Sequence, residues 1–196
     1  MRSILLLTLI AIALASCTGS HENSSGTQAA IPRRHAYPRI ALPDSAFTAI
    51  EAKDVTLQVN SAVADSIATR NGDNGAQFID IRYPEQHSAV YITITPVSAS
   101  SIAGVIANRM ERVGLNLGGS DAEMIDFDNN AGFESKMFVT RADISTPVQF
   151  VSTDGRDIVV SGVAFIADAS KEHADSLSPV TAMLRRDILH LLKTLK

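Results

Sequence analysis

Several short segments of the chain alternate apolar and polar residues, and this pattern restricts the fold more than any other feature. In residues 78–83, Ile79 and Ile81 fall on one side of an extended chain and Asp80 and Arg82 on the other. A period of two is typical of half-buried antiparallel strands. We predict further strands in residues 55–59, 90–95, 123–128, 134–140, 148–153 and 158–166.

Two segments instead have the three- and four-residue spacing of amphipathic helices. In the first, Ser98 and Ser100 are candidate N-caps and Gly114 is a candidate C-terminal glycine. In the second, Ser178 is the candidate N-cap and Pro179 the first helical residue. The apolar face of the first helix consists of Ile102, Val105, Ile106, Met110 and Val113. That of the second consists of Val180, Met183, Leu184, Ile188, Leu191, Leu192 and Leu195. The predicted class is α+β, a mostly antiparallel β-sheet flanked by helices, including a C-terminal amphipathic helix.

Glycine-rich and polar segments between these elements predict turns. Residues 71–75 are rich in Asn, Asp and Gly, and Asp154-Gly155-Arg156 between apolar runs is a strong hairpin signal. Residues 31–43 contain three prolines and should be extended. Residues 126–132 resemble the start of a calcium loop, but Ala131 replaces its glycine and Met137 its final glutamate, so we predict a polar turn and no metal site.

The N-terminal sequence predicts a lipoprotein signal. Arg2 precedes an apolar run over residues 4–15, which is shorter than the roughly 20 residues that span a bilayer. Leu14-Ala15-Ser16-Cys17 looks like the bacterial lipobox, whose cysteine receives a diacylglycerol before cleavage on its amino side. We predict a signal peptide over 1–16, lipidation at Cys17, a flexible tether over 17–30 and a single domain over 31–196.

Acyl chains such as palmitate on Cys17 would hold the protein on a membrane without spanning it. The predicted location is therefore the cell envelope, facing the periplasm, with the inner and outer membranes both open. The alternative is a soluble secreted protein whose only cysteine lies at the cleavage site by coincidence.

Composition and motifs argue against several function classes. A net charge of −4 offers no electrostatic reason to expect a nucleic-acid partner. The single cysteine excludes an intramolecular disulfide and a cysteine-rich metal site. The sequence lacks G-x-S-x-G, S-x-x-K, H-E-x-x-H, P-loop and G-x-G-x-x-G motifs, so we expect no enzyme and no cofactor.

Short Asp-Ser-apolar triplets mark candidate modification sites. Asp44-Ser45-Ala46 and Asp65-Ser66-Ile67 fit the pattern used for O-glycosylation in Bacteroidetes envelopes. We take Ser45 and Ser66 as candidate acceptors, and a mature mass equal to protein plus lipid alone would refute this.

Several segments together resemble the gliding motility-associated lipoprotein GldD family. They are Tyr37-Pro38-Arg39-Ile40-Ala41-Leu42-Pro43, residues 79–84, Ala89-Val90-Tyr91-Ile92, Pro147-Val148-Gln149-Phe150, Gly162-Val163-Ala164-Phe165, residues 174–180 and residues 187–195. The resemblance covers nearly all of the mature chain. The element order is also similar to the PsbP/Mog1-like α/β/α sandwich, an analogy of fold alone.

The resemblance implies an envelope lipoprotein without established catalytic activity, needed for gliding motility and the associated type IX secretion machinery. Its partners would be other envelope proteins of that machinery. Our candidate partner-contact residues are Tyr37, Arg39, Tyr83, Asp154, Asp175, Ser176 and His190. The alternative is a periplasmic lipoprotein that binds or hydrolyses glycan or lipid, with Asp80, Asp154, Asp175 and His190 as its candidate residues.

Overall fold

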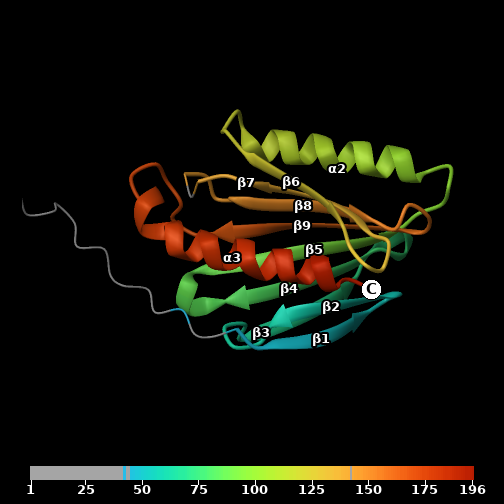
Figure 1. The fold of residues 1–196 in the computed structure, drawn as a ribbon, viewed down its shortest axis with the longest axis horizontal. Coiled ribbons are helices and arrows are strands. Elements are labelled where there is room, and N and C mark those ends of the chain that lie inside the picture. Colours follow the sequence, from blue (N-terminus) through green and yellow to red (C-terminus); the bar gives the residue numbers. More distant parts are fainter. Residues whose placement is uncertain (1–41, 43–44, 142) are drawn as a thin grey trace, which may run out of the picture. The chain divides into compact units, whose positions relative to one another are not determined.

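The computed structural model describes residues 42, 45–141 and 143–196. Nine strands and two long helices follow one another along this part of the chain (Figure 1). The strands are β1 (Phe47–Ala52), β2 (Val55–Asn60), β3 (Ser66–Asn71), β4 (Gln77–Tyr83), β5 (Ser88–Pro96), β6 (Glu123–Asp128), β7 (Glu134–Val139), β8 (Val148–Thr153) and β9 (Ile158–Ile166). The helices are α2 (Ile102–Leu117) and α3 (Ala174–Thr194), and short 3-10 turns η2 (Asp73–Gly75) and η3 (Pro84–Gln86) flank β4.

Seven strands form one sheet in the order β3-β4-β5-β9-β8-β7-β6, and every neighbouring pair is antiparallel. β1 and β2 form a separate antiparallel hairpin. The predicted α+β class with a mostly antiparallel sheet is confirmed. Since sequential strands pair through short turns on both sides of the central β5–β9 pair, local hairpins generate most of the sheet.

The two helices pack on opposite faces of this sheet. α2 covers Phe138, Val151 and Val159. The other face carries the larger core, in which the apolar face of α3, the sheet and the β1–β2 hairpin meet. The buried α3 residues of this core are Val180, Met183, Leu184, Ile188, Leu191, Leu192 and Leu195, which are the apolar face that the sequence predicts.

Phe150 and Gly162 form a cross-strand pair at the centre of the larger core. A β-carbon on Gly162 would lie 2.5 Å from two ring atoms of Phe150 and 2.9 Å from the Tyr91 carbonyl oxygen. The glycine is therefore required by the close approach of the aromatic ring and not by an unusual backbone angle.

Both helices depart from the predicted boundaries. α2 begins after Ser101 and continues past Gly114 to Gly118, which adopts the left-handed conformation at φ 57°. α3 begins at Ala174, one turn before the predicted start, so Pro179 lies inside the helix. Proline has no N–H to donate to a carbonyl four residues earlier, but the preceding turn is still closed by the bond from Leu177 N to His173 O.

Two strands, β1 and β3, were not predicted. All six β3 residues are exposed, and the sequence shows no buried face there. β1 has a buried residue only at its end. The predicted turns are confirmed: residues 73–75 connect β3 and β4, and Asp154-Gly155-Arg156 connects β8 and β9.

The turn between β6 and β7 is hydrogen-bonded to the C-terminal end of α3. Asn129 Nδ2 donates to the carbonyl oxygens of Leu192 at 2.9 Å and Leu195 at 2.8 Å. Its Oδ1 accepts from the backbone N–H groups of Ala131 and Phe133. This segment, compared above with a calcium loop, therefore caps the end of α3.

Candidate functional site

Some sequence predictions fall outside the described residues. These are the signal peptide over 1–16, the Cys17 lipidation site, the tether over 17–30, and Tyr37 and Arg39. The extended segment over 31–43 is described only at Leu42, which packs against the larger core. None of the helices in the described ranges is long and apolar enough to cross a membrane.

Asp154 is a turn residue. Its Oδ1 accepts hydrogen bonds from the backbone N–H groups of Arg156, Asp157 and Ile158 at 2.9–3.0 Å. Partial burial alone would raise the pKa of this carboxyl, but these backbone donors outweigh it and hold the pKa below its ordinary value. The geometry therefore accounts for Asp154 as a residue that shapes the β8–β9 turn.

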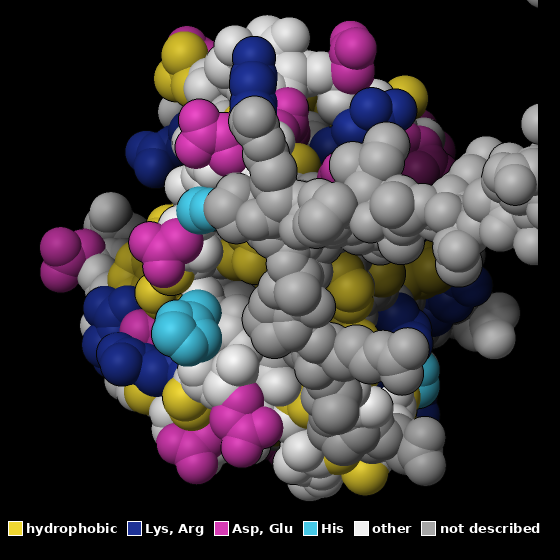
Figure 2. All heavy atoms as spheres, turned by 90° about the vertical axis from the view of Figure 1, so that its left-hand side faces the viewer, with side chains coloured by type: hydrophobic (Ala, Val, Ile, Leu, Met, Phe, Trp, Pro, Cys, Tyr) yellow, Lys and Arg dark blue, Asp and Glu magenta, His cyan; other side chains and the backbone are white. Residues whose placement is uncertain are grey.

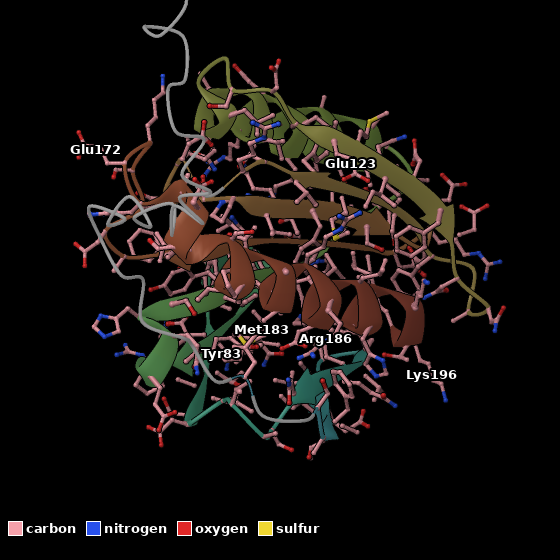
Figure 3. The ribbon with its side chains drawn as sticks, turned by 60° about the vertical axis from the view of Figure 1, so that its left-hand side comes forward. Tyr83, Glu123, Glu172, Met183, Arg186 and Lys196 are labelled. Atoms are coloured by element: carbon pink, nitrogen blue, oxygen red, sulfur yellow. The ribbon has the colours of Figure 1, made fainter. Side chains whose placement is uncertain are left out.

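Tyr83 belongs to a buried polar cluster between the sheet, β2 and α3. Asp187 is 4% exposed, and its carboxylate accepts from Asn60 Nδ2 at 2.9 Å and from Arg186 Nε at 3.0 Å. Tyr83 and Asp187 line the same small cavity. Figure 3 shows Tyr83, Met183 and Arg186 along one side of α3. We call Asn60, Tyr83 and Asp187 the buried polar cluster, and the exposed Arg186 contacts it from the solvent side.

The electrostatics of this cluster keep Tyr83 neutral. Burial raises the pKa of the phenol well above its ordinary value, and the negative charge of Asp187 raises it further. Asp187 was not among the residues selected from the sequence, although an acid at this position lies on the apolar face of the predicted helix. A charged residue on such a face is the signal that could have identified it.

We expect the free energy of unfolding to fall as pH rises above about 10, because Tyr83 ionises in the unfolded chain but stays protonated in the folded one. For one group the slope is at most about 1.4 kcal/mol per pH unit. Urea denaturation between pH 9 and 11 should show a shallower decline for Tyr83→Phe. Tyr91→Phe, at an exposed tyrosine, is the matched control. Equal slopes for Tyr83→Phe and the wild type would contradict this expectation.

His190 joins α3 to the β1–β2 hairpin. Its Nε2 lies 2.7 Å from Gln58 Oε1, and its ring stacks on Phe47 with centroids 3.6 Å apart. Both partners lie on the hairpin, so the predicted partner-contact residue makes internal contacts. His190 lies one helical turn from Asp187, and no hydrogen bond or ion pair joins these two side chains in the described part.

A cavity beside the first turns of α3 contains Asp175. It encloses about 660 Å³ between α3 and the outer strands of the sheet. One wall is α3, through Ala174, Asp175, Ser178, Thr181, Ala182 and Arg185. The other wall is the segment leading into β6 and the end of β7, through Asp121, Ala122, Glu123, Val139, Thr140 and Arg141. We call this cavity the α3 groove.

The α3 groove carries charges of both signs. Arg185 Nη2 donates to Glu123 Oε1 at 2.9 Å and connects the two walls. Asp121, Arg141 and Asp175 are exposed beside this pair. Figure 2 views the end of the domain where α3 begins, and acidic and basic side chains both surround hydrophobic ones there.

Thr181 adds an unused polar group to the α3 groove. The residue is 7% exposed, and its hydroxyl has no hydrogen-bond partner among the described residues. A buried hydroxyl without a partner costs about 1–3 kcal/mol, which a bound polar group could recover. Thr181, Arg185 and Arg141 were not selected from the sequence. Thr181 and Arg185 lie on α3 with Asp175, whereas only the packing of α3 beside the end of β7 brings Arg141 to this groove.

The roles predicted for three serines remain predictions, namely partner contact for Ser176 and O-glycosylation for Ser45 and Ser66. Ser176 Oγ donates to the His173 carbonyl oxygen at 2.7 Å in the first turn of α3, and it does not line the α3 groove. Ser45 precedes β1, Ser66 begins β3, and both are exposed.

The four residues considered as candidates for a hydrolytic site lie in separate parts of the domain. Asp80 pairs with Arg70 across β3 and β4 at 3.2 Å. Asp154 shapes a turn, Asp175 lines the α3 groove and His190 contacts the hairpin. Over residues 45–141 and 143–196, no group of three or more His, Cys, Asp and Glu side chains is arranged to hold a metal ion.

Comparison with known proteins identifies the chain by family. The family model described as gliding motility lipoprotein GldD matches residues 27–196. No curated protein and no solved structure matches the chain. The fold and this match define the class, a lipoprotein with an antiparallel α+β domain. The chain belongs to the gliding motility lipoprotein GldD family.

Proposed function

We propose that this protein is a non-enzymatic accessory lipoprotein of the cell envelope that binds another envelope protein in the α3 groove. It is anchored through lipid on Cys17, faces the periplasm and serves gliding motility together with the associated type IX secretion machinery. The family match supports the link to motility. The observation that carries the binding role is the α3 groove, a cavity of about 660 Å³ lined by charged, polar and apolar side chains.

The chemistry of the α3 groove favours a polypeptide segment as its occupant. The groove offers carboxylates, guanidinium groups, a buried hydroxyl and apolar walls from Ala122, Val139 and Ala182. A segment of a partner protein carries the same mixture of charges, amide groups and apolar side chains. Its charged groups would pair with the carboxylates and guanidinium groups of the groove, its amides with the hydroxyl, and its apolar side chains with the apolar walls.

Blocking the groove tests this proposal. In cells that lack the wild-type gene, we expect Ala182→Trp to abolish surface spreading and the secretion of type IX cargo, because the indole fills the groove from its exposed helical wall. Lys193→Trp is the matched control, since Lys193 is an exposed α3 residue outside the groove.

Protein level and melting temperature should be those of the wild type for both variants. A second variant, Arg141→Glu, reverses one groove charge without filling space, and we expect at least a severalfold loss of spreading. Normal spreading by Ala182→Trp at wild-type protein level would contradict the proposed role of the groove.

A further inference from the structure

A second cavity lies where α2 meets the part of the sheet that it leaves uncovered. It encloses about 180 Å³. We call it the α2 pocket. The residues that matter are Tyr91 on β5, Arg109, Arg112 and Asn116 on α2, Gln149 on β8 and Ser161 on β9. α2 packs on Phe138, Val151 and Val159, whereas Tyr91 on the same face of the sheet is 41% exposed.

The charge of the α2 pocket is opposite to that of the chain. Arg109 and Arg112 line it, and none of its lining residues is acidic. The whole chain has a net charge of −4. Burial lowers the pKa of Arg109, and the positive charge of Arg112 lowers it further. Two neighbouring guanidinium groups that repel each other attract an anion.

The pocket also holds hydrogen-bond donors without acceptors. Gln149 is 2% exposed in a central strand; its Oε1 accepts from Asn116 Nδ2 at 3.0 Å, but its Nε2 has no partner in the described part. Arg109 Nη2 donates to Thr95 Oγ1 at 3.2 Å, while its buried Nε is likewise without an acceptor among the described residues. A ligand rich in acceptor oxygens would satisfy both groups.

An aromatic surface adjoins these donors. Phe165 is 37% exposed on the same face of the sheet, and the register places it diagonally across β5–β9 from Tyr91. Exposed aromatic rings beside polar groups pack well against the apolar C–H face of a sugar ring, which presents hydroxyl oxygens around its edge. An aromatic surface, donors and positive charge together fit an anionic saccharide.

We propose that the α2 pocket binds an anionic sugar unit of an envelope glycan. The anionic group, carboxylate or phosphate, lies between Arg109 and Arg112. A sugar oxygen accepts from Gln149 Nε2, and the ring packs on Tyr91. This binding site is separate from the α3 groove, and neither proposal requires the other.

Saturation-transfer NMR on the full chain in detergent tests the site with four probes: glucuronate, glucose 6-phosphate, glucose and inorganic phosphate. We expect one or both anionic sugars to bind more tightly than glucose and than phosphate, and the preferred one identifies the anionic group. Equal binding of inorganic phosphate, equal binding of glucose, or no binding of either anionic sugar at millimolar concentration overturns the proposal.

Variants connect the binding to these residues. Arg112→Gln, at an exposed position, should weaken binding about 10-fold or more because a charge-assisted hydrogen bond is lost. Tyr91→Ala should weaken it severalfold. Gln149→Met tests the buried donor, provided its melting temperature stays near that of the wild type. Arg156→Gln is the control, because Arg156 is exposed on a turn and does not line the pocket. Unchanged affinity in Arg112→Gln and Tyr91→Ala contradicts the assignment.

Discussion

Asn60→Ala is expected to lower the free energy of unfolding by about 3–5 kcal/mol, because it removes the buried one of the two donors to the Asp187 carboxylate. Asn60 is 1% exposed, and its amide donates to Asp187. Its Oδ1 also accepts from the backbone N–H groups of Ala46 and Ala62. The substitution therefore removes a hydrogen-bond partner from these two N–H groups and from the Asp187 carboxylate. Urea denaturation at neutral pH measures the loss.

A double-mutant cycle separates this interaction from simple loss of volume. Asp187→Ala alone leaves the Asn60 amide buried without its acceptor, while the double variant removes both groups. We expect the double variant to be more stable than the sum of the single effects by about 1–3 kcal/mol. Thr48→Ala, which removes an exposed hydrogen bond to Ser61 in the same hairpin, should change stability by less than about 0.5 kcal/mol. Strict additivity of the two single effects would contradict a coupled buried cluster.

Phe150→Ala is expected to cost about 3–5 kcal/mol, since it opens a cavity at the centre of the larger core. Phe150 is among the largest fully buried side chains. Gly162→Ala in the wild-type background should cost about 1–3 kcal/mol, because the new methyl group overlaps the Phe150 ring.

The two substitutions should interact strongly. In the Phe150→Ala background the ring is absent, so we expect Gly162→Ala to cost clearly less than in the wild type, although the Tyr91 carbonyl oxygen still lies 2.9 Å from the added carbon. Gly104→Ala in α2 is the control, because no atom lies within 4 Å of its added carbon. This control should stabilise the helix by roughly 0.5–1 kcal/mol. An equal cost of Gly162→Ala in both Phe150 backgrounds would show that the ring does not set the requirement for glycine.

The alternating segments predicted most of the sheet because their buried faces are continuous in sequence. β6, β8 and β9 have the bounds that the sequence predicts. β3 could not be predicted in this way, since an edge strand with six exposed residues has no apolar face. The ends of α2 and α3 differ from prediction because Gly114 and Pro179 are tolerated inside helices whose faces pack well.

The candidate sites were less predictable than the fold. Asp175 was identified from its own segment, but the α3 groove also requires Thr181, which lies two helical turns away, and Arg141, which lies at the end of β7. Tyr83 and Asp187 are distant in sequence and meet only through tertiary packing. A local pattern contains no information about which strands a helix will cover, so such groupings require the three-dimensional structure.

Site-specific photo-crosslinking in the native envelope tests the proposed docking role most directly. A photoreactive phenylalanine analogue placed at Ala182 lies in the wall of the α3 groove, and the same analogue at Lys193 lies outside it. We predict a crosslink from position 182, and none from position 193, to one protein of the gliding or secretion machinery, lost when Arg141→Glu is added. Crosslinking from position 182 only to this chain's own N-terminal segment, or equally from both positions, would contradict the account.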